Sequence, residues 1–109
     1  MATNQNQPHS VPTDDPEFQE LVDYFVGELP ARVTELEQVT NRGDVAMLQV
    51  LVHRLKGCAP SFGFPAVGNA AANIEQAILE TGADQCEIDA LRSDVNELIV
   101  LCRSYFRND

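Results

Sequence analysis

A short run near the middle of the chain, His53-Arg54-Leu55-Lys56-Gly57, combines residue types that suit phosphoryl transfer. A neutral imidazole nitrogen is a good nucleophile near pH 7 and can form a covalent N–P bond. Residues three and four apart on a helix are neighbours, so His53, Lys56 and Gly57 would form one patch on a helical segment. Lys56 would stabilise the charge on the transferring phosphoryl group and favour the neutral form of His53 before attack.

Gly57 needs a reason to stand inside a predicted helix, because glycine there costs roughly 1 kcal/mol relative to alanine. Without a side chain beside His53, the active site of a partner could approach the imidazole closely. A lone histidine on a helix is usually structural, and the lysine and glycine neighbours favour a functional role here. Metal binding is disfavoured, because no Asp, Glu, Cys or His lies three or four residues from His53. Neither a Ser/His/Asp set nor paired carboxylates support hydrolase chemistry.

The charge distribution sets the same region apart. The net charge of −10 argues against nucleic acids and anionic membranes as partners. No acid occurs between Asp44 and Glu75, where an even spread of the 17 acids would place about five. Buried helix would account for missing acids, but not for Arg54 and Lys56, which is the only lysine in the chain. An acidic protein thus keeps one window free of acids and places cations in its middle.

The apolar spacing predicts a helix from Asp15 onward, after a polar tail over residues 1–14 that we expect to be disordered. Pro30 predicts a kink or a break in this helix, because proline lacks the backbone donor. The expected inward stripe of this first helix, before and after the proline, comprises Phe18, Leu21, Val22, Phe25, Leu29, Val33, Leu36 and Val39.

Three further helices follow. Gly43 and Asp44 predict a helix stop and a new N-cap, Pro60 would bend the end of the next helix, and Asp84 with Glu87 predicts a capping box for the last one. Their expected ranges are 45–62, 65–81 and 84–105. The outward stripe of the first of these three comprises Ala46, Gln49, Val50, His53, Lys56, Gly57 and Pro60. The short connections predict an all-α, antiparallel, up-and-down four-helix bundle over residues 15–109, with a short or kinked N-terminal helix.

The sequence also indicates the compartment. No signal peptide and no stretch of about 20 apolar residues is visible, so a cytoplasmic location is expected. Cys58, Cys86 and Cys102 lack metal-ligand spacing, and all three fall in expected helices. They are interpreted as small packed thiols rather than disulfide partners or redox sensors.

The run His53-Arg54-Leu55-Lys56-Gly57, followed by Phe62-Gly63, resembles the H-x-L-K-G…G signature of histidine-containing phosphotransfer (HPt) domains. The alanine-rich segment before Ile74-Glu75 continues the resemblance, which covers roughly residues 16–107. It implies a four-helix bundle that shuttles phosphoryl groups between receiver-domain aspartates in multistep phosphorelays. By position it implies that His53 is phosphorylated, that Lys56 stabilises the phosphoryl group and that Gly57 provides clearance.

Two residues depart from the usual pattern of this family. Cys58 replaces the small hydroxyl residue common after K-G, and Pro60 falls where most members continue the helix. Ser61 could supply a hydroxyl group in place of the missing one. Glu75 and Gln76 border the expected site from the next helix and are expected to be solvated surface.

The expected function is therefore that of a phosphocarrier, not an enzyme, without ATP-binding or kinase activity and without a cofactor of its own. The expected partner is a receiver domain, of a response regulator or hybrid kinase, that carries its own aspartate and bound Mg²⁺. We expect a monomer that binds neither nucleic acid nor membrane. The expected docking face around His53 comprises Arg54, Val50, Ala46, Gly68, Ala71 and Ala72.

Two other functions fit the same pattern. The bundle could be an interaction module whose histidine is not phosphorylated, or the phosphoacceptor domain of a larger sensor kinase. The starting Met1 and the polar tail favour a free-standing protein.

Overall fold

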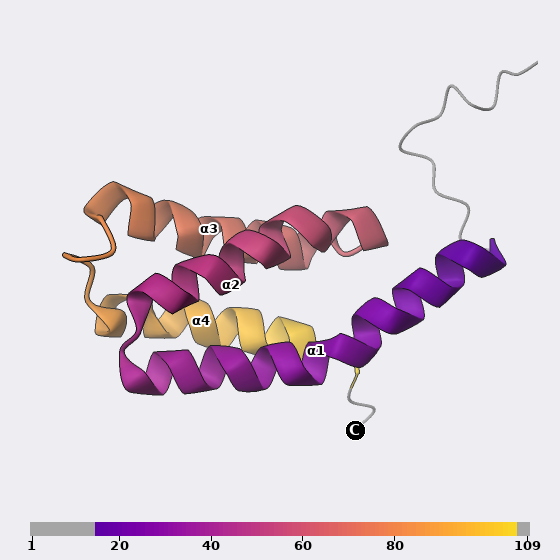
Figure 1. Ribbon diagram of the computed structural model, residues 1–109, viewed down its shortest axis with the longest axis horizontal. Coiled ribbons are helices and arrows are strands. Elements are labelled where there is room, and N and C mark those ends of the chain that lie inside the picture. The colour runs from indigo at the N-terminus through magenta and orange to yellow at the C-terminus, as the bar shows by residue number, and fades with distance from the viewer. Residues whose placement is uncertain (1–14, 107–109) are drawn as a thin grey trace, which may run out of the picture.

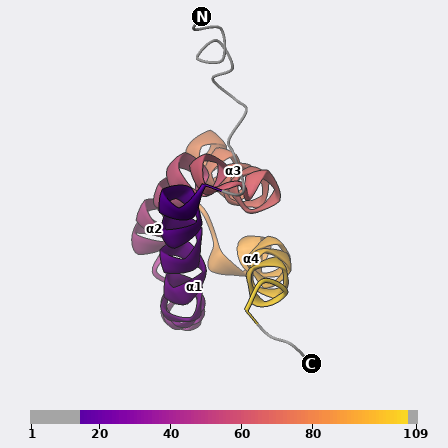
Figure 2. The same cartoon turned by 90° about the vertical axis from the view of Figure 1, so that its right-hand side faces the viewer.

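The protein is an antiparallel helical bundle in the computed structural model, which describes residues 15–106. The tail expected over residues 1–14 lies outside the described residues. Four α-helices and a short 3₁₀ turn follow one another as α1 (Pro16–Arg42), α2 (Val45–Cys58), η2 (Pro60–Phe62), α3 (Pro65–Thr81) and α4 (Ile88–Arg103). Each α-helix packs on two neighbours, so that the four surround one core (Figures 1 and 2). The all-α four-helix bundle predicted from the sequence is confirmed.

The core consists of the apolar stripes of the four helices, with aliphatic side chains from every one of them. Burying each such side chain contributes roughly 1.5–3 kcal/mol. Those that are almost wholly buried are Leu29, Leu36, Leu48, Val52, Val67, Ile74, Ile78, Leu91, Val95 and Leu98. None of the helices in residues 15–106 is both long and apolar enough to cross a membrane.

The predicted helix ends near residue 43 are confirmed. Gly43 has a φ of +69°, the left-handed conformation that glycine adopts without strain, and its amide donates to carbonyl groups at the end of α1. The carboxylate of Asp44 then accepts a hydrogen bond of 3.0 Å from the amide of Met47 and caps α2. Pro60 ends α2 in the 3₁₀ turn η2, so the helix expected to reach Phe62 stops at Cys58.

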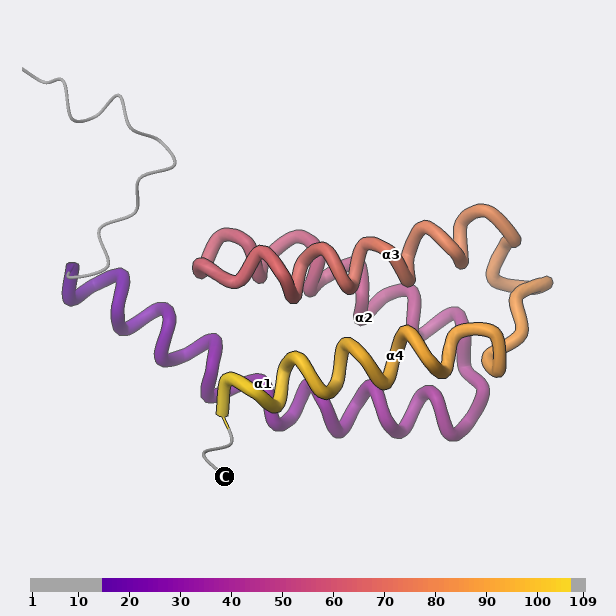
Figure 3. The backbone as a smooth tube through the Cα atoms, turned by 180° about the vertical axis from the view of Figure 1, so that it is seen from behind, coloured from indigo at the N-terminus to yellow at the C-terminus, as the bar shows by residue number. Residues whose placement is uncertain are grey.

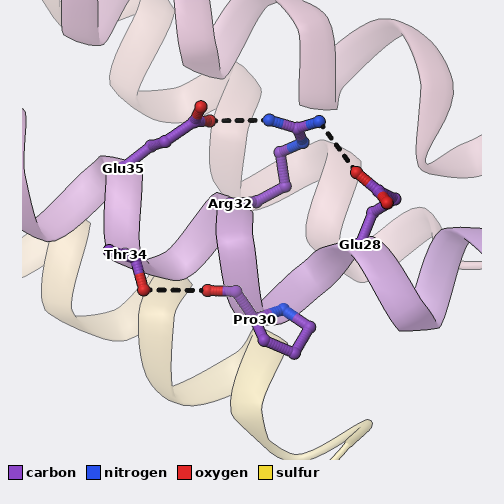
Figure 4. A network of polar contacts seen from close by, with 5 residues as sticks. All are labelled: Glu28, Pro30, Arg32, Thr34 and Glu35. Carbon is purple, nitrogen blue, oxygen red and sulfur yellow. Dashed lines mark hydrogen bonds and ion pairs between the residues drawn. The ribbon is translucent and has the colours of Figure 1, made fainter.

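Helix α1 bends but does not break, and its first half turns away from the bundle (Figures 1 and 3). Pro30 lacks the amide that would continue the hydrogen-bond ladder. Its carbonyl also accepts a 3.1 Å hydrogen bond from the hydroxyl of Thr34, a contact that bends helices (Figure 4). Arg32 forms ion pairs of 3.2 Å with Glu28 and 2.7 Å with Glu35, which join the turns on the two sides of the bend.

The bend leaves part of the predicted α1 stripe outside the core. Leu21 is 51% exposed, Phe18 and Val22 are only partly covered, and the prediction that these three residues face inward is wrong for Leu21 and incomplete for the other two. Phe25 and Leu29, nearer the bend, are buried as expected. The physical reason is geometric, because a helix that leaves the bundle has no neighbour to cover its apolar face.

An aromatic cluster holds the bent part of α1 against the rest of the molecule. The ring of Phe25 stacks on Phe62 of η2 and on Phe64, with 5.2 Å between ring centroids in each pair. Tyr105 meets Phe64 edge-on at 4.7 Å. These contacts join α1, η2 and the segment after α4 at one end of the bundle.

The predicted start of the last helix is wrong. Residues 83–85 form a turn in which the carbonyl of Gly82 accepts hydrogen bonds from the amides of Gln85 at 3.0 Å and Cys86 at 2.9 Å. Helix α4 therefore begins only at Ile88, and no side chain caps it. Cys86 consequently lies in the connection between α3 and α4 rather than in a helix.

Gly68 allows the closest approach between α3 and the end of α2. A Cβ atom built on Gly68 would lie 2.6 Å from Cγ and 2.8 Å from Cδ of Pro60. Separations below 3.0 Å require one of the two groups to move. The proline ring is rigid, so the helices themselves would have to separate.

We predict that Gly68→Ala lowers the free energy of unfolding by about 1–3 kcal/mol, the usual cost of overpacking. Gly27→Ala is the matched control, because Gly27 is also helical and its added Cβ would meet no atom within 4 Å. The control should leave stability unchanged or raise it by up to about 1 kcal/mol through helix propensity. Urea denaturation of both variants measures the difference, and equal stability would contradict the close-packing argument.

Candidate functional site

Helix α2 presents the expected site residues on its outer face. Val52 and Leu55 are buried against the core, and this orientation leaves the His53 side chain 67% exposed and Lys56 45% exposed. Gly57 is exposed on the same face, and a Cβ built on it would meet no atom within 4 Å. The space beside the imidazole is thus open, as the clearance interpretation requires.

The carboxylate of Glu75, on α3, lies between the imidazole and the lysine and contacts both. Its Oε2 is 2.7 Å from Nδ1 of His53, and its Oε1 is 2.6 Å from Nζ of Lys56. The side chain of Glu75 is only 8% exposed. The expectation that Glu75 is solvated surface is therefore wrong. Each oxygen of this carboxylate thus contacts one of the two residues that the sequence predicts to take part in phosphoryl transfer.

This contact assigns the tautomer of the imidazole. An ionised carboxylate can only accept hydrogen bonds, so Nδ1 of His53 must carry a proton and donate it to Glu75. In the neutral ring the lone pair is then on Nε2. Because the side chain is largely exposed, this unprotonated nitrogen is accessible from outside the bundle.

The two contacts also change the acidity of Glu75. The hydrogen bond from Lys56 lowers the pKa of this carboxyl group below its usual value of 4.5, and the hydrogen bond from His53 lowers it further. Burial opposes this shift but does not cancel it. Glu75 is consequently ionised throughout the neutral range, which is the state that can hold both neighbours.

Two hollows lie on either side of the imidazole. One, of about 550 Å³, lies between α1 and α2, and Tyr24, Phe25, Gly57 and Phe62 are among the residues that line it. The other, of about 390 Å³, lies on the α3 side and is lined by Gln49, Val50, His53, Arg54 and Glu75. His53 and Arg54 line both hollows and so form the ridge between them.

The expected docking residues fall into two groups. Ala46, Val50 and Arg54 are exposed and Ala72 is half-buried, so all four can contact a partner. Gly68 and Ala71 are buried, and the expectation that they line the docking face is corrected. Their small size serves the contact between α3 and α2, because they fall on the inward face of α3.

Cys58 and Ser61 contribute little to the site. Burial raises the pKa of the Cys58 thiol, so a reactive thiolate is scarce near pH 7, and simple packing is favoured over redox sensing. Ser61 is exposed in η2, and no hydrogen bond joins it to His53 in the described structure. Within residues 15–106, no group of three or more His, Cys, Asp and Glu side chains is arranged to hold a metal ion.

Comparison with known protein families gives a match. The model of the Hpt domain family matches residues 20–101, which include His53, Lys56, Gly57 and Glu75. The chain belongs to the Hpt domain family. Hpt domains are phosphocarriers rather than kinases, and they exchange phosphoryl groups with receiver domains. The chain matches none of the curated proteins and none of the solved structures with which it was compared.

The role of Glu75 in this Hpt domain was missed at the sequence level, although one signal pointed to it. Ala71, Ile74, Glu75 and Ile78 follow the spacing of an inward helical stripe, in which the acid takes a buried position. An acid on an inward stripe needs a cationic or hydrogen-bonding partner. Glu75 is also the first acid after the acid-free window that contains Lys56.

We predict that Glu75→Gln destabilises the protein at neutral pH and that the difference from wild type disappears on acidification. A depressed pKa stabilises the fold above the unfolded-state value of about 4.5, and this contribution is lost as pH falls through the lower folded-state pKa. Melting temperatures of both proteins between pH 7 and pH 3 test this. Glu80→Gln is the control, because Glu80 lies on the exposed face and, within residues 15–106, accepts a hydrogen bond only from the uncharged side chain of Gln76. This variant should leave the pH profile of stability nearly unchanged. A constant gap between wild type and Glu75→Gln would contradict the ion-pair assignment.

Proposed function

We propose that this Hpt domain protein accepts a phosphoryl group on Nε2 of His53 from the aspartyl phosphate of a receiver domain and passes it to another. The observation that carries the proposal is the contact of Glu75 with Nδ1, which leaves Nε2 as the exposed nucleophile. The receiver would bring its own aspartate and Mg²⁺. The cytoplasmic location and monomeric state expected from the sequence remain predictions.

The transfer needs no further residue of this chain to act as a general acid or base. The Nε2 lone pair attacks phosphorus, an N–P bond forms, the aspartyl O–P bond breaks, and its electron pair leaves with the carboxylate. Nε2 has no proton to lose, because the neutral ring carries its proton on Nδ1. The ring becomes cationic during attack, and the carboxylate of Glu75 at 2.7 Å stabilises that charge. The reverse sequence delivers the group to a second aspartate.

Lys56 and Gly57 would support this step in different ways. The Nζ atom of Lys56 is held by Glu75 at 2.6 Å, and its exposed ammonium group can turn to the phosphoryl oxygens when they arrive. Gly57 leaves room for the receiver to approach. The docking face that we propose around them comprises Ala46, Val50, Arg54 and Ala72.

His53→Gln should abolish uptake of phosphate from a phosphorylated receiver, since the amide has no nucleophilic nitrogen. Wild-type protein should acquire a label that is acid-labile and base-stable, as an N–P bond is. His9→Gln is the matched control, because His9 is the only other histidine in the chain, and it should label like wild type. Labelling of His53→Gln would overturn the assignment, and unlabelled wild type would favour a purely interacting bundle.

Lys56→Met should slow transfer about tenfold or more at a saturating receiver concentration, because the side chain stays unbranched and only one atom shorter but loses the charge that stabilises the phosphoryl oxygens. Lys56→Arg, which keeps a cation, should be affected less. Rapid-quench measurement of a single turnover gives the rate, and circular dichroism checks that the variants fold. An unchanged rate for Lys56→Met would remove the proposed role of this residue.

A further inference from the structure

Among the lysine and arginine side chains of residues 15–106, Arg54 alone has no acidic partner. Arg32, Arg42, Lys56, Arg92 and Arg103 each lie within 4 Å of a carboxylate oxygen. Arg54 forms no ion pair within residues 15–106, although the chain has 17 acids and only seven lysines and arginines. Acids are excluded from its own sequence neighbourhood, so its charge faces solvent unneutralised.

Arg54 lies where a partner that covers His53 would contact it. Only His53 and Arg54 line both of the hollows described above, one toward α1 and one toward α3. A surface that covers the imidazole and reaches into either hollow must therefore pass close to the guanidinium group. Two other cations of this region do not substitute for it, because Arg32 is paired with Glu28 and Glu35, and Lys56 with Glu75.

We infer that Arg54 determines which receivers dock, by forming an ion pair with a carboxylate that lies beside the acceptor aspartate of the partner. This inference rests on the proposed function and adds the chemistry of the partner's docking surface. The rest of this acidic chain repels a negatively charged surface, so Arg54 attracts such a partner to the one face where transfer is possible. A guanidinium group also orients a carboxylate by paired hydrogen bonds.

A docking charge affects association more than the chemical step. With the receiver that labels wild-type protein fastest, Arg54→Ala should lower kcat/KM for transfer about tenfold, and Arg54→Glu on the order of 100-fold. Both variants should approach the wild-type rate at a saturating receiver concentration. The decrease of kcat/KM with rising salt, which is expected for wild type, should be weaker in Arg54→Ala.

Three controls separate docking from other causes. Arg92→Ala removes a cation that is paired with Asp89 on α4 and should behave like wild type. Arg54→Lys keeps the charge and should recover most of kcat/KM. Labelling by phosphoramidate, a small N–P donor that needs no docking surface, should be equal in wild type, Arg54→Ala and Arg54→Glu.

A charge swap identifies the partner group directly. Exposed acids around the receiver's acceptor aspartate are replaced one at a time by lysine, and one replacement should restore transfer to Arg54→Glu while impairing transfer to wild type. Unchanged kcat/KM in Arg54→Ala, or a loss that persists at saturation and with phosphoramidate, would overturn this inference and leave His53 as the phosphorylated residue. If wild type accepts no phosphate from any receiver, the proposed function itself fails.

Discussion

The site depends on one carboxylate that is shared between two helices. Glu75 reaches from α3 to α2 and holds the imidazole of His53 with one oxygen and the ammonium group of Lys56 with the other. This single contact assigns the proton to Nδ1, keeps Nε2 free and restrains the cation nearby. The acid tolerates its buried position because both of its oxygens are satisfied by charged or polar donors. The exposed imidazole of His53 is thereby held by a buried side chain.

The bundle is built so that this contact can form. Small residues on α3 let it approach α2 and the η2 turn, and Gly68 lies so close to the ring of Pro60 that an added methyl group would collide with it. The same closeness brings the carboxylate of Glu75 within hydrogen-bond distance of His53 and Lys56 on α2. Residues first interpreted as docking surface, Gly68 and Ala71, thus act on the site from inside the bundle.

The outer surface complements this rigid interior. The bend of α1 turns its first half away from the bundle and leaves a hollow beside His53, whose wall includes the exposed Tyr24 and the stacked Phe25. Arg32 and its two glutamates join the turns on both sides of the bend and neutralise one another. Of the cations around the imidazole in residues 15–106, Arg54 is the one without a carboxylate partner, in a chain whose net charge is −10. The face thus offers a partner an apolar hollow together with a cation that no carboxylate of residues 15–106 neutralises.

The sequence by itself determined the features that depend on neighbours along the chain. Helical periodicity predicted the four helices, and the residue types of Gly43 and Asp44 predicted that they cap α1 and α2. The spacing of His53, Lys56 and Gly57 predicted one outward patch, because residues one turn apart share a helix face. Only the tertiary structure decided that Glu75 joins His53 across 22 residues, that the stripe at Leu21 stays uncovered and that Gly68 faces Pro60. Those outcomes depend on the distance and rotation between helices, which side-chain packing sets and which no local repeat encodes.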